Sequence, residues 1–308
     1  MSTSGTYRHV VNFNEIAEEA LDLLQIGGDG ETLSGDMQQR ARRTTNFMLK
    51  AWEGQGIHLW TFEEGSLFLA KGQSKYNFTT SNLANTWHET TLSAAEALGQ
   101  TVLSCTSTAN ITVADIIGIV LDDKTLHWTT VVSKTSTTVT VAVALPSAAA
   151  SGNFVRNYVP SSFIPVTRVM ETRRRESSTY EQDMNFESRK DYFHLPDKTS
   201  TGQPIQSYFS RQNPDGVMYL WPAPDDANTV INFTYERPIQ TIVSGTDNFD
   251  VPNYWYEAII YGLAERLILK FGCGKDRAML IKQAAMDALD LALEYDTDLY
   301  PITVNMGG

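Results

Sequence analysis

The 308 residues are 42% hydrophobic and 19% charged, a composition typical of a globular protein with one large domain or several small ones. The net charge of −12 disfavours a protein that grips nucleic acid, because phosphate binding requires clustered lysines and arginines. The two cysteines, Cys105 and Cys273, have no spacing that indicates a zinc site or a disulfide framework. The sequence has neither an N-terminal signal pattern nor an apolar run that could cross a bilayer, so we expect a soluble protein, made inside the cell, with no membrane contact.

Two helices joined by a glycine turn are predicted within residues 12–52. Asn12 and Ser34 are suited to cap them, because each side chain can accept a hydrogen bond from the first helical turn. Gly27 and Gly28 end the first helix, since glycine adopts left-handed backbone angles without steric cost. Apolar residues recur with the helical period and form one stripe on each helix: Ile16, Ala20, Leu23 and Leu24, then Met37, Ala41, Thr45, Met48 and Trp52.

Two further helices are predicted near the end of the chain. Pro252 precedes a helix with apolar residues at four-residue spacing over 255–271, and a turn at Gly272 leads into the next helix. The four helices together predict a helical bundle built from residues 1–66 and 250–298. The two ends of the chain therefore meet in space, and the middle of the chain forms a separate excursion.

The outer faces of the first two helices carry opposite charge. The first helix has Glu15, Glu18, Glu19 and Asp22, and the second has Arg40, Arg42, Arg43 and Lys50. A helical hairpin with such polar outer faces cannot bury its apolar stripe alone and needs another helical layer or neighbouring subunits. The residues that we expect to serve in helical subunit packing are Ile16, Leu23, Met48, Trp52, Trp255 and Leu263.

The middle of the chain is predicted to be rich in β-strands. Short β-branched runs separated by turn residues predict an inserted β module over 86–160, a small barrel or sandwich. Strand patterns on either side predict an antiparallel β domain over 67–85 and 161–249. Within that domain we expect a strand at Tyr192–Leu195 and a long exposed loop over Arg174–Arg189, which is polar and unpatterned. The predicted fold class is α+β, with a helical bundle, an antiparallel β domain and the inserted module.

No arrangement of residues indicates catalysis. The five histidines lack metal-ligand spacing, and the glycine-rich segments follow helices rather than strands, which disfavours phosphate binding. The acidic pairs Asp122–Asp123 and Asp225–Asp226 lie in predicted turns, where solvated aspartates are usual. We therefore expect a protein that is not an enzyme, with no catalytic residue, no metal site and no cofactor.

Two segments are candidate contact sites. Arg173, Arg174 and Arg175 form the sharpest charge cluster; a solvated strand end, an acidic protein neighbour and DNA phosphate are all open explanations, and protein contact is favoured over DNA. The C-terminal tail over 299–308 is apolar and contains a proline; such a segment is often disordered alone, or it extends a partner's sheet or fills its groove, and the partner contact is favoured here. The tail residues expected to contact a partner are Leu299, Tyr300, Pro301, Ile302, Val304 and Met306.

An ordered set of motifs runs through most of the chain outside the inserted module. In the block Phe13–Phe78 these are Gly27-Gly28, Trp52 with Gly56, and Gly72-Gln73 with Tyr76; later come SRKDYFHL at 188–195, GQP at 202–204, MYLWPAP at 218–224 and VPNYWYEAIIYGLAERL at 251–267. In this order the motifs resemble the head-to-tail adaptor proteins of short-tailed bacteriophages, which include the tail tubular A-like head completion proteins. The inserted module departs from the smallest members of that family.

The resemblance implies a structural virion protein at the vertex where the portal meets the tail. It implies a homo-oligomeric ring of twelve copies, docked below the portal protein and above the tail nozzle or hub protein. In that family the helical part packs subunit to subunit around a DNA channel, and the C-terminal tail engages the portal. Double-stranded DNA would pass through without sequence-specific binding, and the protein would be made in the host cytoplasm before it joins the virion.

Two other classes of function stay open. The Thr- and Ser-rich strands of 86–160 permit a binding module that attaches a tail fibre, a decoration protein or a glycan. A lytic enzyme is the other class, because some relatives of such adaptors carry lytic activity. The absence of a paired, isolated carboxylate motif argues against the enzyme.

Overall fold

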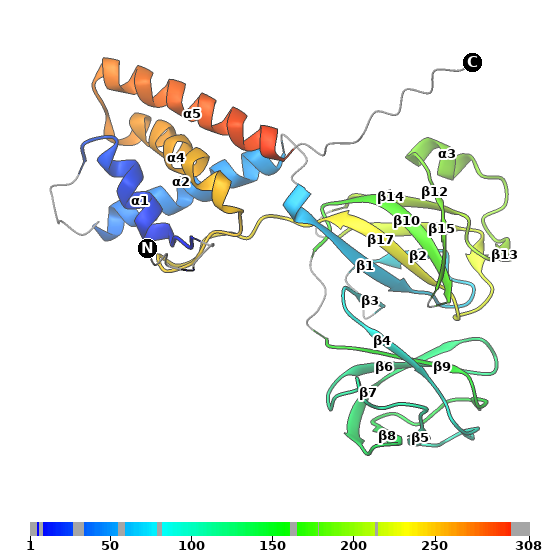
Figure 1. Ribbon diagram of the computed structural model, residues 1–308. Helices are drawn as coiled ribbons and strands as arrows, with labels where there is room; N and C mark the ends of the chain where they lie inside the picture. Colours follow the sequence, from blue (N-terminus) through cyan, green and yellow to red (C-terminus); the bar gives the residue numbers. More distant parts are fainter. Residues whose placement is uncertain are drawn as a thin grey trace. The chain divides into compact units, whose positions relative to one another are not determined.

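The computed structural model describes residues 5, 9–26, 34–54, 59–78, 82–160, 165–177, 179–212 and 215–296. The chain divides into two compact units, which we call the helical unit (Met1–Thr61 with Pro238–Gly308) and the β unit (Phe62–Arg237). Figure 1 shows helices packed together in the first unit and twisted sheets in the second. The fold is therefore α+β, with a few helices and mostly antiparallel sheets, as the sequence predicts.

The first helices of the helical unit begin at capping residues. Asn12 Oδ1 accepts a hydrogen bond from the Glu15 N–H at 3.2 Å, and the Glu15 carboxylate accepts one from the Asn12 N–H at 2.8 Å. Ser34 Oγ accepts a hydrogen bond from the Met37 N–H at 3.4 Å, so both predicted caps are confirmed. The helical elements are α1 (Phe13–Asp22), α2 (Gly35–Glu53), η1 (Leu59–Thr61), η2 (Asn253–Trp255), α4 (Tyr256–Phe271) and α5 (Lys275–Tyr295).

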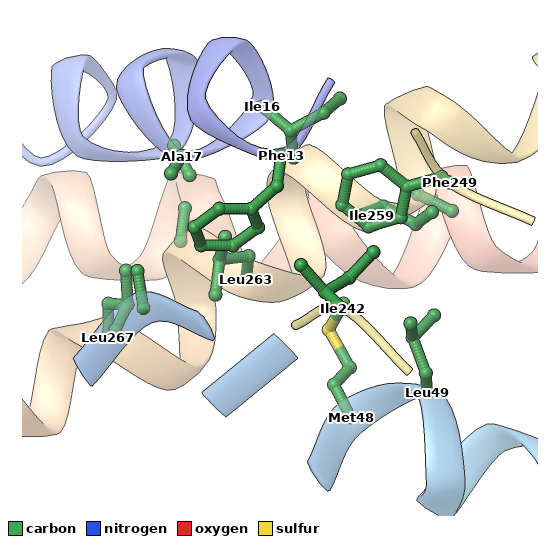
Figure 2. Close-up of a cluster of buried hydrophobic side chains, with 14 of the residues drawn as sticks. Phe13, Ile16, Ala17, Met48, Leu49, Ile242, Phe249, Ile259, Leu263 and Leu267 are labelled. Atoms are coloured by element: carbon green, nitrogen blue, oxygen red, sulfur yellow. The ribbon is translucent and has the colours of Figure 1, made fainter. Parts of the chain in front are cut away.

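Helix α4 is the central element of the helical unit, because it contacts α1, α2 and α5. Figure 2 shows Phe13 of α1 lying among Phe249 and two residues of α4, Ile259 and Leu263, and all four are buried. On another side, α2 approaches α4 closely at Gly262. A Cβ atom on Gly262 would lie 2.9 Å from the Trp52 ring and 3.0 Å from Met48 Sδ, so the close approach requires glycine.

Two sheets enclose the main core of the β unit. The five-stranded sheet has the order β11-β10-β17-β1-β3, and the four-stranded sheet has the order β12-β14-β15-β2. Leu67, Ile231 and Phe233 from the first sheet are buried with Met218 and Leu220 from the second. The elements are β1 (Phe62–Phe68), β2 (Lys75–Asn77), β3 (Leu83–Ala84), β10 (Arg168–Ser177), β11 (Tyr180–Asp183), β12 (Asn185–Phe186), α3 (Arg189–His194), β14 (Gln206–Ser210), β15 (Val217–Trp221) and β17 (Val230–Glu236), with a short parallel pair of β13 (Thr201–Gly202) and β16 (Ala223–Pro224).

The stretch between β3 and β10 forms a six-stranded antiparallel sheet with the order β4-β9-β6-β7-β8-β5. An isolated bridge between Leu92 and Cys105 joins the residue after β4 to the residue after β5, which brings the two edge strands together. This sheet encloses a core of its own, in which Leu103, Ile117 and Val155 are buried. Its strands are β4 (His88–Thr91), β5 (Val102–Ser104), β6 (Ile116–Val120), β7 (Leu126–Lys134), β8 (Thr138–Val141) and β9 (Phe154–Tyr158).

Two local predictions for the β unit are wrong. The segment Arg174–Arg189 is not a long loop, because its first residues continue β10 and the next ones form β11 and β12. Tyr192–Leu195 is not a strand, because most of it belongs to α3, which Ser188 caps by accepting a hydrogen bond from the Asp191 N–H at 3.2 Å. A short aromatic run is compatible with a helix or a strand, and here the cap at Ser188 favours the helix.

Residues 238–249 lie in the helical unit, although the sequence pattern predicts them in the β domain.

We predict that Gly262→Ala destabilises the helical unit, although alanine is normally the better helix former by about 1 kcal/mol. The new methyl group would overlap the Trp52 ring, and overpacking of this kind costs about 1–3 kcal/mol. Chemical denaturation followed by tryptophan fluorescence measures the change. The matched control is Gly35→Ala, where a Cβ atom has nothing within 4 Å, so its free energy of unfolding should be unchanged or raised. Equal effects at both positions would contradict the close α2–α4 approach.

Candidate assembly surfaces

Helix α5 exposes large apolar side chains around much of its surface. Its buried residues are few, and the helix contacts α4 and η2. Exposed apolar side chains also occur on the neighbouring helices, with Leu269 of α4 at 94% and Phe47 of α2 at 66% exposure. A helix that is apolar on most sides is typically covered by other protein. The exposed apolar residues of α5 are Met279, Leu280, Met286, Leu291, Leu293 and Tyr295.

A buried carboxylate holds the end of α5. Asp296, at 6% exposure, accepts hydrogen bonds from the Tyr254 hydroxyl at 2.6 Å, from Trp255 Nε1 at 3.1 Å and from Trp60 Nε1 at 3.2 Å. Burial, and then the hydrogen bond to Asp296, raise the pKa of the Tyr254 hydroxyl. These contacts tie the C-terminal end of α5 to residues beside the start of α4. The tail over 299–308 follows this point in the sequence, and the tail residues proposed as partner contacts lie outside the described residues.

The residues expected to pack subunits together lie mainly inside the chain's own helical core. Ile16, Met48, Trp255 and Leu263 are fully or almost fully buried, and Trp52 is buried against Trp255 at a ring distance of 5.7 Å. Leu23 is half-buried and packs against the same cluster. Their own chain therefore provides the second layer that the stripes need. A role of these residues in packing between subunits stays a prediction.

The opposite charges predicted for α1 and α2 are present on exposed residues. In α1, Glu18, Glu19 and Asp22 are exposed, and none forms a side-chain hydrogen bond or ion pair with another described residue. In α2, Arg43 is exposed and likewise has no such partner among the described residues. The other basic residues of α2 have partners in the chain: Arg40 pairs with Asp36 at 2.9 Å, Lys50 pairs with Glu53 at 2.7 Å, and Arg42 donates to the Val243 carbonyl.

The three consecutive arginines lie on β10 and are paired within the chain. Arg173 bonds to Glu64 of β1 at 2.7 Å, and this hydrogen bond, with the charges of nearby glutamates, raises the pKa of Arg173. Arg174 points to the opposite face of the strand, where it bonds to Glu176 at 2.6 Å. The cluster is therefore not an unpaired basic patch. A contact of Arg173, Arg174 and Arg175 with a partner stays a prediction.

A buried ionic cluster joins the six-stranded sheet to the rest of the β unit. Arg156 of β9 is 1% exposed, and its Nε lies 2.9 Å from the Glu89 carboxylate of β4. The same guanidinium donates to the carbonyl of Ala227 at 2.7 Å and to that of Asn228. Glu89 also lies 3.4 Å from Arg175 of β10, so one carboxylate holds an arginine from each side. Burial lowers the pKa of Arg156, and the charge of Glu89 opposes this change.

An aromatic cluster lies at the same junction. Phe68 of β1 is fully buried, and its ring centroid lies 5.1 Å from that of Trp87, 5.3 Å from that of Trp128 and 5.7 Å from that of Tyr158. The first ring precedes β4, and the other two belong to β7 and β9. Trp87 is covered on another side by the Arg175 guanidinium, 4.5 Å from the ring centroid. Ionic and aromatic contacts together fix the six-stranded sheet to the five-stranded sheet, which contains β1 and β10.

Arg156 and Glu89 are not among the candidate residues predicted from the sequence. The available signal is one arginine within the apolar strand FVRNY, because a charged residue in a buried strand requires a buried partner. The identity of that partner depends on the pairing of β4 with β9, which places Glu89 opposite Arg156.

Within the described ranges, no group of three or more histidine, cysteine, aspartate and glutamate side chains is placed to hold a metal ion. None of the helices in these ranges is long and apolar enough to span a membrane.

The model of the SU10 adaptor protein family matches residues 109–304, a range that covers most of the six-stranded sheet, the strands from β10 to β17 and the helices α4 and α5. The block Phe13–Phe78, where the sequence resemblance begins, lies outside the matched range. A search of curated proteins finds no match.

We predict that Glu89→Gln lowers the free energy of unfolding by about 3 kcal/mol, because it leaves the Arg156 charge buried without its counter-charge. The matched control is Glu64→Gln, which removes the partner of Arg173 at a site where the Glu64 side chain is 71% exposed. Loss of that exposed pair should cost less than about 1 kcal/mol. Chemical denaturation of both variants measures the difference. Equal losses would mean that the buried Arg156 charge does not depend on Glu89.

Proposed function

Because the chain belongs to the SU10 adaptor protein family, a family of phage structural proteins, we propose that it forms a ring joining the portal vertex of the virion to the tail. In this proposal the ring is homo-oligomeric, with twelve copies, and lies between the portal protein and the tail nozzle or hub protein. The family membership carries the proposal. The finer points, namely the ring, its copy number and its neighbours, rest on the resemblance given by the ordered sequence motifs.

The exposed apolar surface of α5 supports an assembly role. Its side chains include Met279, Leu280 and Met286, each more than half exposed, and a large apolar surface of this kind favours burial against other protein. The tail over 299–308 follows α5 in the sequence and supplies the proposed portal contact. Three hydrogen bonds hold Asp296, the last described residue before the tail, to the helical unit. Arg173, Arg174 and Arg175 are kept as proposed contacts with an acidic neighbour.

The charge of the chain suits a passage for DNA. Each copy carries a formal net charge of −12, so a ring of copies would be strongly anionic. An anionic wall repels phosphate groups, which would let double-stranded DNA pass without adhering to the wall. In this proposal the ring lines the DNA passage and makes no sequence-specific contact.

We predict that the purified chain binds a portal ring in a fixed stoichiometry. Light scattering of the chain alone, of the portal ring alone and of the mixture measures the masses. The mass of the complex should exceed that of the portal ring by a whole-number multiple of the chain's mass. A variant that ends at Asp296 lacks the tail and should lose this binding, whereas Glu64→Gln, which alters an exposed side chain of the β unit, should keep it.

A full-length chain that ignores the portal ring would contradict the proposed function. The second candidate function would then be favoured. In it, the six-stranded sheet attaches a fibre, a decoration protein or a glycan. That candidate is favoured by exposed apolar side chains on the sheet's own loops and strands, among them Leu98, Val113 and Val143.

A further inference from the structure

The helical unit contains a groove with acidic walls and an apolar floor. The groove has a volume of about 660 Å³ and lies between α1 and α4. Three carboxylates line it, from Glu15 and Glu19 of α1 and from Glu257 of α4. Apart from the capping bond of Glu15, none of these carboxylates has a hydrogen-bond or ion-pair partner among the described residues. The apolar and aromatic lining comes from Val11, Ile16, Leu23, Tyr256, Ile260 and Tyr261.

The same unit presents a surface of opposite character on α2. Phe47 is 66% exposed, and Arg43 and Arg40 lie four and seven residues before it, on the same face of the helix. Arg43 has no carboxylate partner among the described residues, and Arg40 has one exposed partner, Asp36. The opposite face of α2, with Met48 and Leu49, is buried in the core, so the Phe47 side cannot turn inward.

The groove and the Phe47 surface match in charge and in polarity. An aromatic ring that follows two arginines along one helix face fits an apolar groove lined by three carboxylates, because the ring can be buried while the arginines meet acidic groups. The two surfaces belong to one packed unit, in which α1 and α2 both contact α4, so α2 of a chain cannot enter the groove of the same chain. The occupant must come from another molecule.

We propose that the Phe47 surface of one copy docks into the α1–α4 groove of a second copy. The inference rests on the proposed ring function and specifies its subunit contact. Because the two surfaces differ, the contact is heterologous, and repetition of such a contact produces a closed ring or an open filament. Each subunit then uses its groove for one neighbour and its Phe47 surface for the other.

The test is a charge exchange between the two surfaces in the full-length chain. The groove variant is Glu19→Lys with Glu257→Lys, and the α2 variant is Arg40→Glu with Arg43→Glu. The control is Asp22→Lys with Asp225→Lys, which changes the net charge as much as the groove variant does but alters exposed residues that do not line the groove. Sedimentation velocity measures self-association of each protein alone, and light scattering measures the copies of each that bind a portal ring.

Each surface variant alone should lose about tenfold or more in association, because like charges then face each other at the contact. An equimolar mixture of the two variants should regain association, since each lysine-bearing groove then faces a glutamate-bearing α2. The control should behave like the wild type, and Phe47→Ala should weaken association in otherwise wild-type chain.

The outcomes separate this contact from the ring function. Wild-type chain that assembles, with surface variants that assemble equally well, would overturn the contact and leave the ring. Surface variants that fail both alone and in the mixture, while their far-ultraviolet circular dichroism and melting temperature match those of the control, would also overturn the contact. Wild-type chain that assembles neither alone nor on the portal ring would overturn the ring function, and the contact with it.

Discussion

The antiparallel pairing of β1 with β17 is the constraint on which the rest of the chain depends. The two strands pair without interruption from Phe62 opposite Glu236 to Phe68 opposite Val230. The chain leaves the helical unit just before β1 and returns to it just after β17, so this pairing places both crossings next to each other. β10 pairs with the other edge of β17, and β3 with the other edge of β1. The start and the end of the β unit therefore lie side by side, and the N- and C-terminal segments of the chain pack into one helical core.

The two units solve different physical problems. In the helical unit, α4 packs against the apolar stripes of α1 and α2. The exposed surfaces of these helices and of α5 carry charged and large apolar side chains, which suits contacts with other molecules. In the β unit, the junction with the six-stranded sheet buries an arginine and several aromatic rings. A buried ion pair adds little net stability, but it disfavours arrangements that leave its charge unpaired. We infer that Arg156 and Glu89 fix the orientation of the six-stranded sheet more than they stabilise it.

The helices of the helical unit were predictable because their signals are local. Caps at Asn12 and Ser34 and apolar residues at helical spacing depend only on neighbouring positions in the sequence. The sequence does not show what covers these apolar stripes. The periodic apolar pattern around Met48 is the same whether another helix of the chain or another subunit packs against it. Here the chain's own α4 covers it at Gly262. The remaining apolar face, on α5, became recognisable only when burial was known.

The polar strands and the buried ionic cluster were beyond the reach of sequence patterns for a common reason. β10 carries arginines on both faces. Arg173 and Arg175 pair with glutamates of other strands and Arg174 pairs with a glutamate of β10 itself, so no alternation of apolar and polar residues remains. Likewise, Arg156 and Glu89 lie far apart in the sequence and meet through the pairing of β4 with β9. Long-range pairing decides these contacts, and a single sequence does not contain its register.

The most direct test of the account is the number of copies of the chain in purified virions, measured by quantitative mass spectrometry against the portal protein of the same particles. An adaptor ring that matches the portal predicts about one copy of the chain for each portal subunit, in every preparation. A copy number far above that of the portal protein, or the absence of the chain from particles that have completed tails, would contradict the adaptor function.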